Sequence, residues 1–220
     1  MKTKIIPMIL ICFTMFLCAC GSEPAVEGDE LIKKARTDYT NLNSARVLMT
    51  NTATNEVEQT FEFKYDEKGF LTYAYEGTNG DEVYAQYNNS MECFTYENGE
   101  YEYLQKGDES FGAYTKDSTH PQADEGLIVF RPSAVAEAEV TEENGVTHVH
   151  HEYDADKLST ENVVAFTADY YFDSDDNLLY FVETSTLEED GKTTEHSYKV
   201  EITEKNSVEK VENTVEKYKE

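Results

Sequence analysis

Along most of the chain, apolar and polar residues alternate, which is the pattern of β-strands that bury one face. Segments 60–65 and 70–76 are the clearest case, and a turn over 66–69 joins them. Segments 82–88, 91–97 and 100–105 follow after equally short polar connections. Because such short connections join antiparallel neighbours, the pattern predicts an antiparallel meander over 60–105.

The second half of the chain repeats this pattern. Strands are expected at 146–153, 166–172, 178–187 and 193–203. The aromatic and aliphatic positions that would share one face of the sheet are Phe61, Phe63, Tyr65, Leu71, Tyr73, Tyr75, Phe166, Tyr170, Phe172, Tyr180, Tyr198 and Ile202. Between the two halves, residues 132–138 predict a short helix with Pro132 in its first turn, and residues 154–162 predict a short helix or a loop.

One amphipathic helix precedes the strands. Its apolar stripe consists of Leu31, Ile32, Ala35, Tyr39 and Leu42. Asp29 is placed to cap the helix and Asn43 to end it. Composition does not change sharply after this helix, so we expect a single α+β domain over residues 29–205.

The first nineteen residues have the layout of an export signal. Lys2 and Lys4 are followed by an apolar stretch from Ile5 to Leu17, which is shorter than the roughly 20 residues that a spanning helix needs. The signal ends in Leu17-Cys18-Ala19-Cys20, which resembles the lipobox of bacterial lipoproteins. The resemblance implies removal of residues 1–19 and acylation of Cys20, with ordinary secretion or a retained signal as the alternatives.

Such an anchor places the domain on the extracytoplasmic face of the cell membrane. The diacylglycerol on a lipobox cysteine supplies two chains, which hold a protein more firmly than one. Residues 20–28 form the lipidated tether, and its eight polar residues after Cys20 span at most about 25–30 Å. The domain is therefore expected to work close to the bilayer.

Charge and cysteine content exclude several classes of function. Without residues 1–19 the chain carries 16 basic and 45 acidic residues, a net charge of −29. This charge opposes binding to nucleic acids and to anionic lipid headgroups. Cys93 is the one cysteine that neither the signal nor lipidation uses, so no disulfide forms within the chain. We expect Cys93 to be a small buried residue.

The order of elements resembles the LolA/LppX-type lipoprotein family. The similarity is carried by residues 35–47, by the hairpin 171–178 and by the ending 200–211. It implies a strongly curved antiparallel sheet, a half-open barrel, that packs on the N-terminal helix and a short helical insertion. In that family the sheet encloses an apolar cavity for acyl chains.

The resemblance implies a lipid-like or apolar ligand between sheet and helix. The candidate contacts are Phe61, Phe63, Tyr65, Tyr73, Tyr75, Tyr170, Phe172 and Tyr198. For the aromatic face itself, an ordinary core against the helix is the interpretation that we favour over a ligand pocket. A structural or regulatory protein that binds another envelope protein through its sheet surface is the alternative function.

Other constellations are weaker. His148, His150 and Glu152 share one strand face at a spacing compatible with a transition metal, but solvated strand residues are the expected interpretation. Asp173, Asp175 and Asn177 resemble the start of an EF-hand loop, yet the later ligand positions do not fit, so a hairpin turn is expected. No catalytic motif or cofactor site is recognised, and we do not expect an enzyme.

The final segment, residues 206–220, has two interpretations. Val208, Val211, Val215 and Tyr218 are spaced as on a helix, with Asn206 and Glu209 as a capping box. The resemblance instead implies a last edge strand followed by a disordered end, which is the interpretation that we favour.

Overall fold

The computed structural model describes residues 25–79, 82–158, 160 and 162–219. The predicted signal peptide 1–19, Cys20 and the first part of the tether lie outside these residues. Lipidation of Cys20 therefore stays a prediction.

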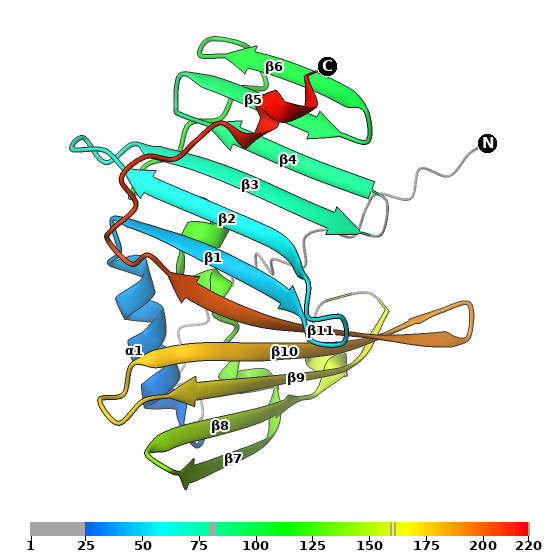
Figure 1. Ribbon diagram of the computed structural model, residues 1–220. Helices are drawn as coiled ribbons and strands as arrows, with labels where there is room; N and C mark the ends of the chain where they lie inside the picture. Colours follow the sequence, from blue (N-terminus) through cyan, green and yellow to red (C-terminus); the bar gives the residue numbers. More distant parts are fainter. Residues whose placement is uncertain (1–24, 80–81, 159, 161, 220) are drawn as a thin grey trace.

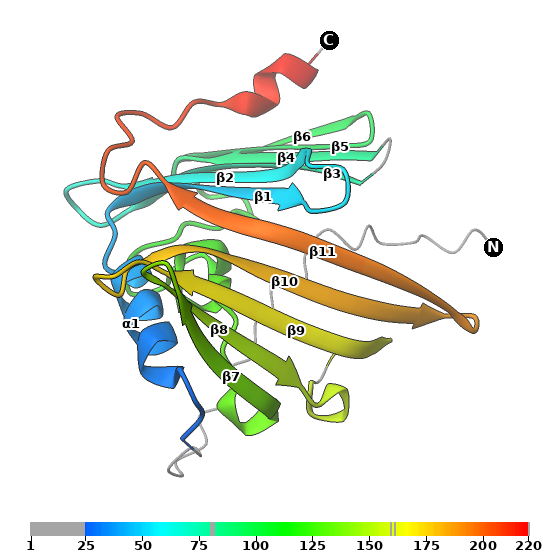
Figure 2. The same ribbon diagram turned by 60° about the horizontal axis from the view of Figure 1, so that its bottom comes forward.

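The eleven strands in the described part of the chain form one antiparallel sheet, in the order β6-β5-β4-β3-β2-β1-β11-β10-β9-β8-β7. Figures 1 and 2 show the sheet bent into an open half-barrel whose edge strands are β6 and β7. The strands are β1 (Ser44–Asn51), β2 (Val57–Tyr65), β3 (Leu71–Asn79), β4 (Glu82–Asn88), β5 (Glu92–Glu97), β6 (Glu100–Gln105), β7 (Val135–Glu143), β8 (Val146–Tyr153), β9 (Val163–Phe172), β10 (Leu178–Glu189) and β11 (Lys192–Thr203). The predicted fold class is confirmed.

Helix α1 (Asp29–Thr40) packs on the concave side of the sheet (Figure 2). Its buried positions include Ile32, Ala35 and Tyr39, as the apolar stripe predicted. The prediction that Asp29 caps the helix is wrong. The N-cap residue is Gly28, which has a left-handed backbone conformation and makes no side-chain cap bond. Asp29 is instead the first helical residue and pairs with Lys33 at 2.8 Å.

The long connection between β6 and β7 covers the concave side next to α1. It contains three short 3₁₀ helices, η1 (Pro121–Ala123), η2 (Glu125–Leu127) and η3 (Pro132–Ala134). A fourth, η4 (Ala155–Lys157), follows β8, in the segment where a short helix or loop was expected.

The predicted helix 132–138 is wrong beyond its first turn. Only Pro132–Ala134 is helical, and residues 135–143 form strand β7, which pairs with β8. The segment alternates with period two, since Ala138 and Val140 are half-buried and Glu139 between them is exposed. It therefore presents one face to the sheet interior. Edge pairing with β8 supplies the hydrogen bonds that a helix would otherwise have provided.

Tyr180 lies on the opposite face from the one predicted. The register between β10 and β9 shifts between Leu178 and Tyr180, so that Tyr180 pairs with Tyr171. A bulge of this kind inserts one residue and reverses the direction of the side chains that follow. Tyr180 therefore stacks on Tyr171 on the convex face, with ring centroids 4.5 Å apart.

The hairpin between β9 and β10 is a turn, as expected. The Asp173 carboxylate accepts hydrogen bonds from the backbone amides of Asp175 and Asn177 at 2.9 Å. These bonds hold the pKa of the Asp173 carboxyl below its usual range.

The tail follows neither interpretation of the sequence. After β11 the chain runs back over the convex face of β3 to β5 and ends in the 3₁₀ helix η5 (Thr214–Tyr218) (Figure 2). Val208 and Val211 are buried against Ala74 and Tyr87. The apolar residues of the tail are therefore spaced so that they dock onto the sheet, and the tail forms neither a regular helix nor an edge strand.

The docked tail predicts a local response to substitution. Replacing Val211 with Asp buries a charge against Ala74, so we expect residues 206–219 to detach while the sheet stays folded. Hydrogen exchange should show faster exchange in the tail and unchanged exchange in β9 and β10. Glu212→Gln, at an exposed neighbour, is the control, and equal protection of the tail in V211D would contradict the docking.

Candidate functional site

The aromatic residues predicted to contact a ligand all lie on the concave side of the sheet. Tyr198 is half-buried, and the others are buried: Phe61, Phe63, Tyr65, Tyr73, Tyr75, Tyr170 and Phe172. The alternation therefore predicted their shared face correctly, because side chains on a strand point to opposite sides in turn.

At the end of the sheet near α1, protein segments cover these aromatic residues. The ring of Tyr39 on α1 packs edge-on against Phe63 at 6.0 Å, and its hydroxyl donates to the carbonyl of Gln122. His120, in the connection after β6, lies 4.5 Å from the ring of Tyr73 and 5.3 Å from that of Phe61. These side chains form a packed core between sheet and helix, so contacts of a ligand with them stay a prediction.

The other end of the concave face carries polar side chains. Tyr198 on β11 lies opposite Asn51 on β1 in the register. Both bind the Glu58 carboxylate: Asn51 Nδ2 donates to Oε1 at 2.9 Å, and the Tyr198 hydroxyl makes a hydrogen bond to the same side chain. Burial and this carboxylate raise the pKa of Tyr198 to about 12. This network gives hydrogen-bond partners to the side chains of Asn51 on β1, Glu58 on β2 and Tyr198 on β11.

Glu183 on β10 lies directly opposite Tyr198 in the sheet but, among the described residues, has no such hydrogen-bond partner. It pairs with Tyr198 on one side and with Ala168 on the other. Its Oε1 is buried and, within the described part of the chain, makes no hydrogen bond. Burial raises the pKa of the Glu183 carboxyl to about 8. The side chain is therefore protonated at neutral pH and is a hydrogen-bond donor.

His151 on β8 lies across Ala168 from Glu183 in the same row. Its Nε2 bonds to the carbonyl of Glu27 at 2.9 Å, and its buried Nδ1 has no partner among the described residues. Burial lowers the pKa of His151, so the ring is neutral. Glu183 and His151 thus lie on either side of the small Ala168 side chain. Each has one buried polar atom without a hydrogen bond among the described residues.

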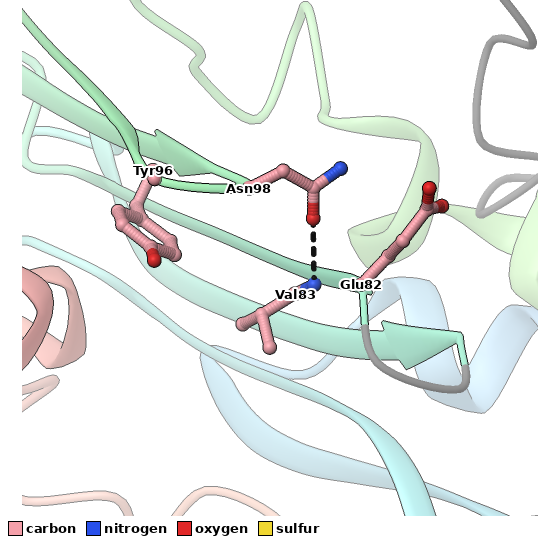
Figure 3. A pocket seen from close by; sticks show the side chains of 5 residues that line it. Glu82, Val83, Tyr96 and Asn98 are labelled. Carbon is pink, nitrogen blue, oxygen red and sulfur yellow. Dashed lines mark hydrogen bonds between the residues drawn. The ribbon is translucent and has the colours of Figure 1, made fainter.

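A pocket of about 420 Å³ lies at the other side of the molecule, at the hairpin of β4 and β5 (Figure 3). Its lining includes Glu82, Val83, Tyr96 and Asn98. Asn98 Oδ1 accepts the amide of Val83 at 3.0 Å, which is a turn-stabilising bond. This pocket is open, and it is not the apolar space between sheet and helix that the resemblance implied.

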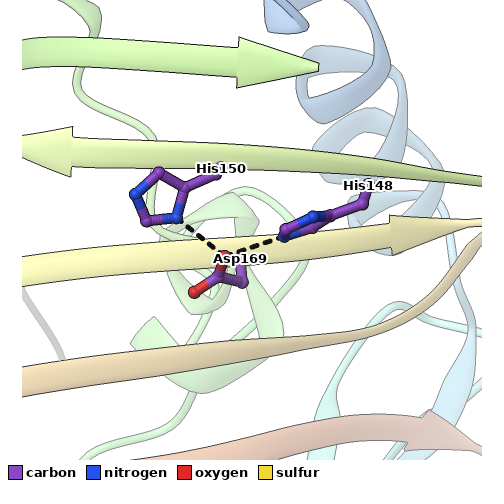
Figure 4. Close-up of side chains that lie close together, drawn as sticks. All are labelled: His148, His150 and Asp169. Carbon is purple, nitrogen blue, oxygen red and sulfur yellow. Dashed lines mark hydrogen bonds and ion pairs between the residues drawn. The ribbon is translucent and has the colours of Figure 1, made fainter. Parts of the chain in front are cut away.

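Two of the three residues predicted to share a possible metal site lie together, and the third does not. His148 and His150 lie side by side on the convex face, and Asp169 of β9 joins them (Figure 4). Glu152 is exposed and is not part of this group. Spacing along one strand could not identify Asp169, because it comes from the neighbouring strand and depends on the register.

Glu183 was not identified from the sequence either. The signal was available, since Phe181, Glu183, Ser185 and Leu187 alternate toward the interior and a carboxylate interrupts the apolar positions. Cys93 is buried, as predicted.

Glu183 makes the stability of the protein depend on pH. Its pKa is raised above the unfolded value, so its contribution to stability is fully present below about pH 4.5 and is lost as the pH rises through about 8. We expect the free energy of unfolding, measured by urea titration from pH 5 to 9, to fall more for the wild type than for Glu183→Gln. Subtracting the two curves removes the general effect of the acidic surface, and parallel curves would contradict the assignment.

The chain matches no protein-family model and no curated protein. Among solved structures it is similar to LprF from Mycobacterium bovis, with 10% identity, a TM-score of 0.44, and coverage of 87% of this chain and 98% of that chain. It is also similar to Rv2717c from M. tuberculosis, with 12% identity, a TM-score of 0.23, and coverage of 74% of this chain and 92% of that chain.

Proposed function

We propose that this protein is a membrane-anchored extracytoplasmic lipoprotein that binds an amphipathic, lipid-like ligand on the concave face of its half-barrel. The polar group of the ligand contacts Glu183, and its apolar part lies along the aromatic side chains beside it. The observation that carries the proposal is the buried carboxyl of Glu183, which has no partner among the described residues.

A buried polar group without a hydrogen bond costs about 1–3 kcal/mol, and native proteins rarely keep one without a reason. The neighbouring tyrosines do not relieve it, because their hydroxyls are engaged elsewhere. Tyr170 donates to the carbonyl of Val129, and Tyr198 binds Glu58. A ligand atom that accepts a hydrogen bond supplies the missing partner.

The surroundings of Glu183 fit an amphipathic molecule. Phe181 and Leu187 on the same strand are buried, while Ser185 and Tyr198 beside them are half-buried and polar. α1, η1 and η2 pack at the other end of the concave face (Figure 2). Ligand binding is therefore proposed for the polar end of that face, away from the packed core under α1.

The alternative, recruitment of an envelope protein through the sheet, has less support. Edge strands β6 and β7 carry glutamates at alternate positions, and charged edge strands discourage pairing with another chain. The exposed large apolar residues, including Phe70, Met91 and Leu179, lie on different segments of the chain.

In this proposal the acyl chains on Cys20 attach the protein to the membrane, and the short tether keeps the concave face within reach of lipids that leave the bilayer. No helix in the described part of the chain is long and apolar enough to cross a membrane.

Lipid extraction tests the proposal. The Cys20→Ser protein is used, so that its own acyl anchor does not contribute to the extract, and bound lipid is measured by mass spectrometry. We expect non-covalent lipid in this protein and about tenfold less after the further change Glu183→Leu, which removes the hydrogen bond. Glu183→Gln keeps a donor of similar shape and should retain most of the lipid.

Glu188→Gln, an exposed change on the same strand, is the matched control. Glu183→Leu should also raise the free energy of unfolding at pH 8 by about 1–3 kcal/mol, because it removes a buried unpaired polar group. An extract without lipid, or equal lipid in the Glu183→Leu protein, would contradict the proposed function.

A further inference from the structure

We propose that His148, His150 and Asp169 form a binding site for a divalent transition-metal ion on the convex face of the sheet. One ligand atom from each residue lies within 4.8 Å of the other two (Figure 4). This site lies on the opposite face from Glu183, and the inference does not depend on ligand binding there.

The two imidazole rings converge on a single oxygen. His148 Nε2 and His150 Nδ1 each lie 2.8 Å from Asp169 Oδ1. Two ligand atoms around one metal ion are about 3.0 Å apart in octahedral and about 3.4 Å apart in tetrahedral coordination when each bond is about 2.1 Å long. The nitrogen–oxygen distances are slightly shorter than this, so these atoms need only a small separation to accept one ion.

The sheet holds these side chains in place. His148 and His150 are two residues apart on β8, and His150 pairs directly with Asp169 on β9. The His148 ring stacks on Tyr171 with centroids 4.6 Å apart and planes 7° apart. Tyr171 stacks in turn on Tyr180, and Lys199 lies over the Tyr180 ring at 4.5 Å. This row of rings fixes the orientation of one ligand before any ion binds.

The electrostatics also favour a cation. Within the described residues, no lysine or arginine pairs with Asp169, and its ion-pair partners are the two histidines. His150 pairs with Glu139 of β7 on its other side, and that exposed residue adds a negative charge next to the site. The chain as a whole is strongly acidic. A bound divalent ion therefore adds positive charge where the protein has little of its own.

The donor set selects the class of ion. Two imidazole nitrogens with one carboxylate oxygen suit zinc, nickel, copper or cobalt, whereas magnesium and calcium prefer oxygen ligands alone. The side chains of His148, His150 and Asp169 are 32%, 34% and 22% exposed, so an ion reaches them from solvent. The remaining coordination positions face outward, and the ion links β8 to β9.

Titration of the purified full-length protein in detergent with Co²⁺ tests the site. We expect absorption bands of nitrogen-ligated cobalt that saturate at one ion per chain, and displacement of cobalt by Zn²⁺ but not by a large excess of Mg²⁺. His150→Asn and Asp169→Asn should each weaken Co²⁺ binding by about tenfold or more. His196→Asn, a histidine on β11 outside the cluster, is the matched control.

Two further variants keep the test decisive. Tyr171→Ala should weaken binding because it frees the His148 ring, while Tyr171→Phe preserves stacking and should bind as the wild type does. Thermal melts in EDTA establish that each variant is folded. The site is refuted if the wild type shows no saturable cobalt spectrum, or if His148→Asn/His150→Asn binds Co²⁺ as tightly as the wild type.

Discussion

The hydrogen bonds between β1 and β11 join the two halves of this protein into one sheet. The two strands pair from Arg46 with Thr203 to Asn51 with Tyr198, across about 150 residues of chain. On the convex face Arg46 makes ion pairs with Glu62 of β2 and with Glu204 just after β11, both at 2.7 Å. Without this pairing β1–β6 and β7–β11 would be two separate sheets, and neither would have a concave face large enough to enclose α1.

The bend of the joined sheet divides its concave face into two environments. In the packed part, Tyr39 and Tyr170 have partners for their hydroxyls, the carbonyls of Gln122 and Val129. Burying a tyrosine is favourable under that condition. At the other end Glu183 Oε1 is buried without such a partner among the described residues, and burial raises the pKa of the carboxyl. The same sheet thus provides a satisfied core at one end and an unsatisfied polar group at the other.

The convex face is organised by the register of the strands. A bulge in β10 turns Tyr180 outward, which completes the stack from Lys199 through Tyr171 to His148. The tail covers the neighbouring part of this face over β3 to β5, where Tyr218 stacks on Tyr96. The metal-ligand cluster on β8 and β9 lies outside the area that the tail covers. The stack depends on a single-residue shift in pairing, because that shift changes the face to which Tyr180 points.

The sequence alone determined the class of the fold. Period-two alternation and short turns were sufficient to predict the meander, the amphipathic stripe predicted α1, and the shared face of Phe61, Phe63 and Tyr73 was correct. These properties are local, since each is encoded within about ten residues. The tertiary structure decided the strand identity of residues 135–143, the outward face of Tyr180, the docking of the tail, the isolation of Glu183 and the position of Asp169 beside the two histidines. Each of these depends on which distant strand lies alongside, and pairing between distant strands is not encoded in a local pattern.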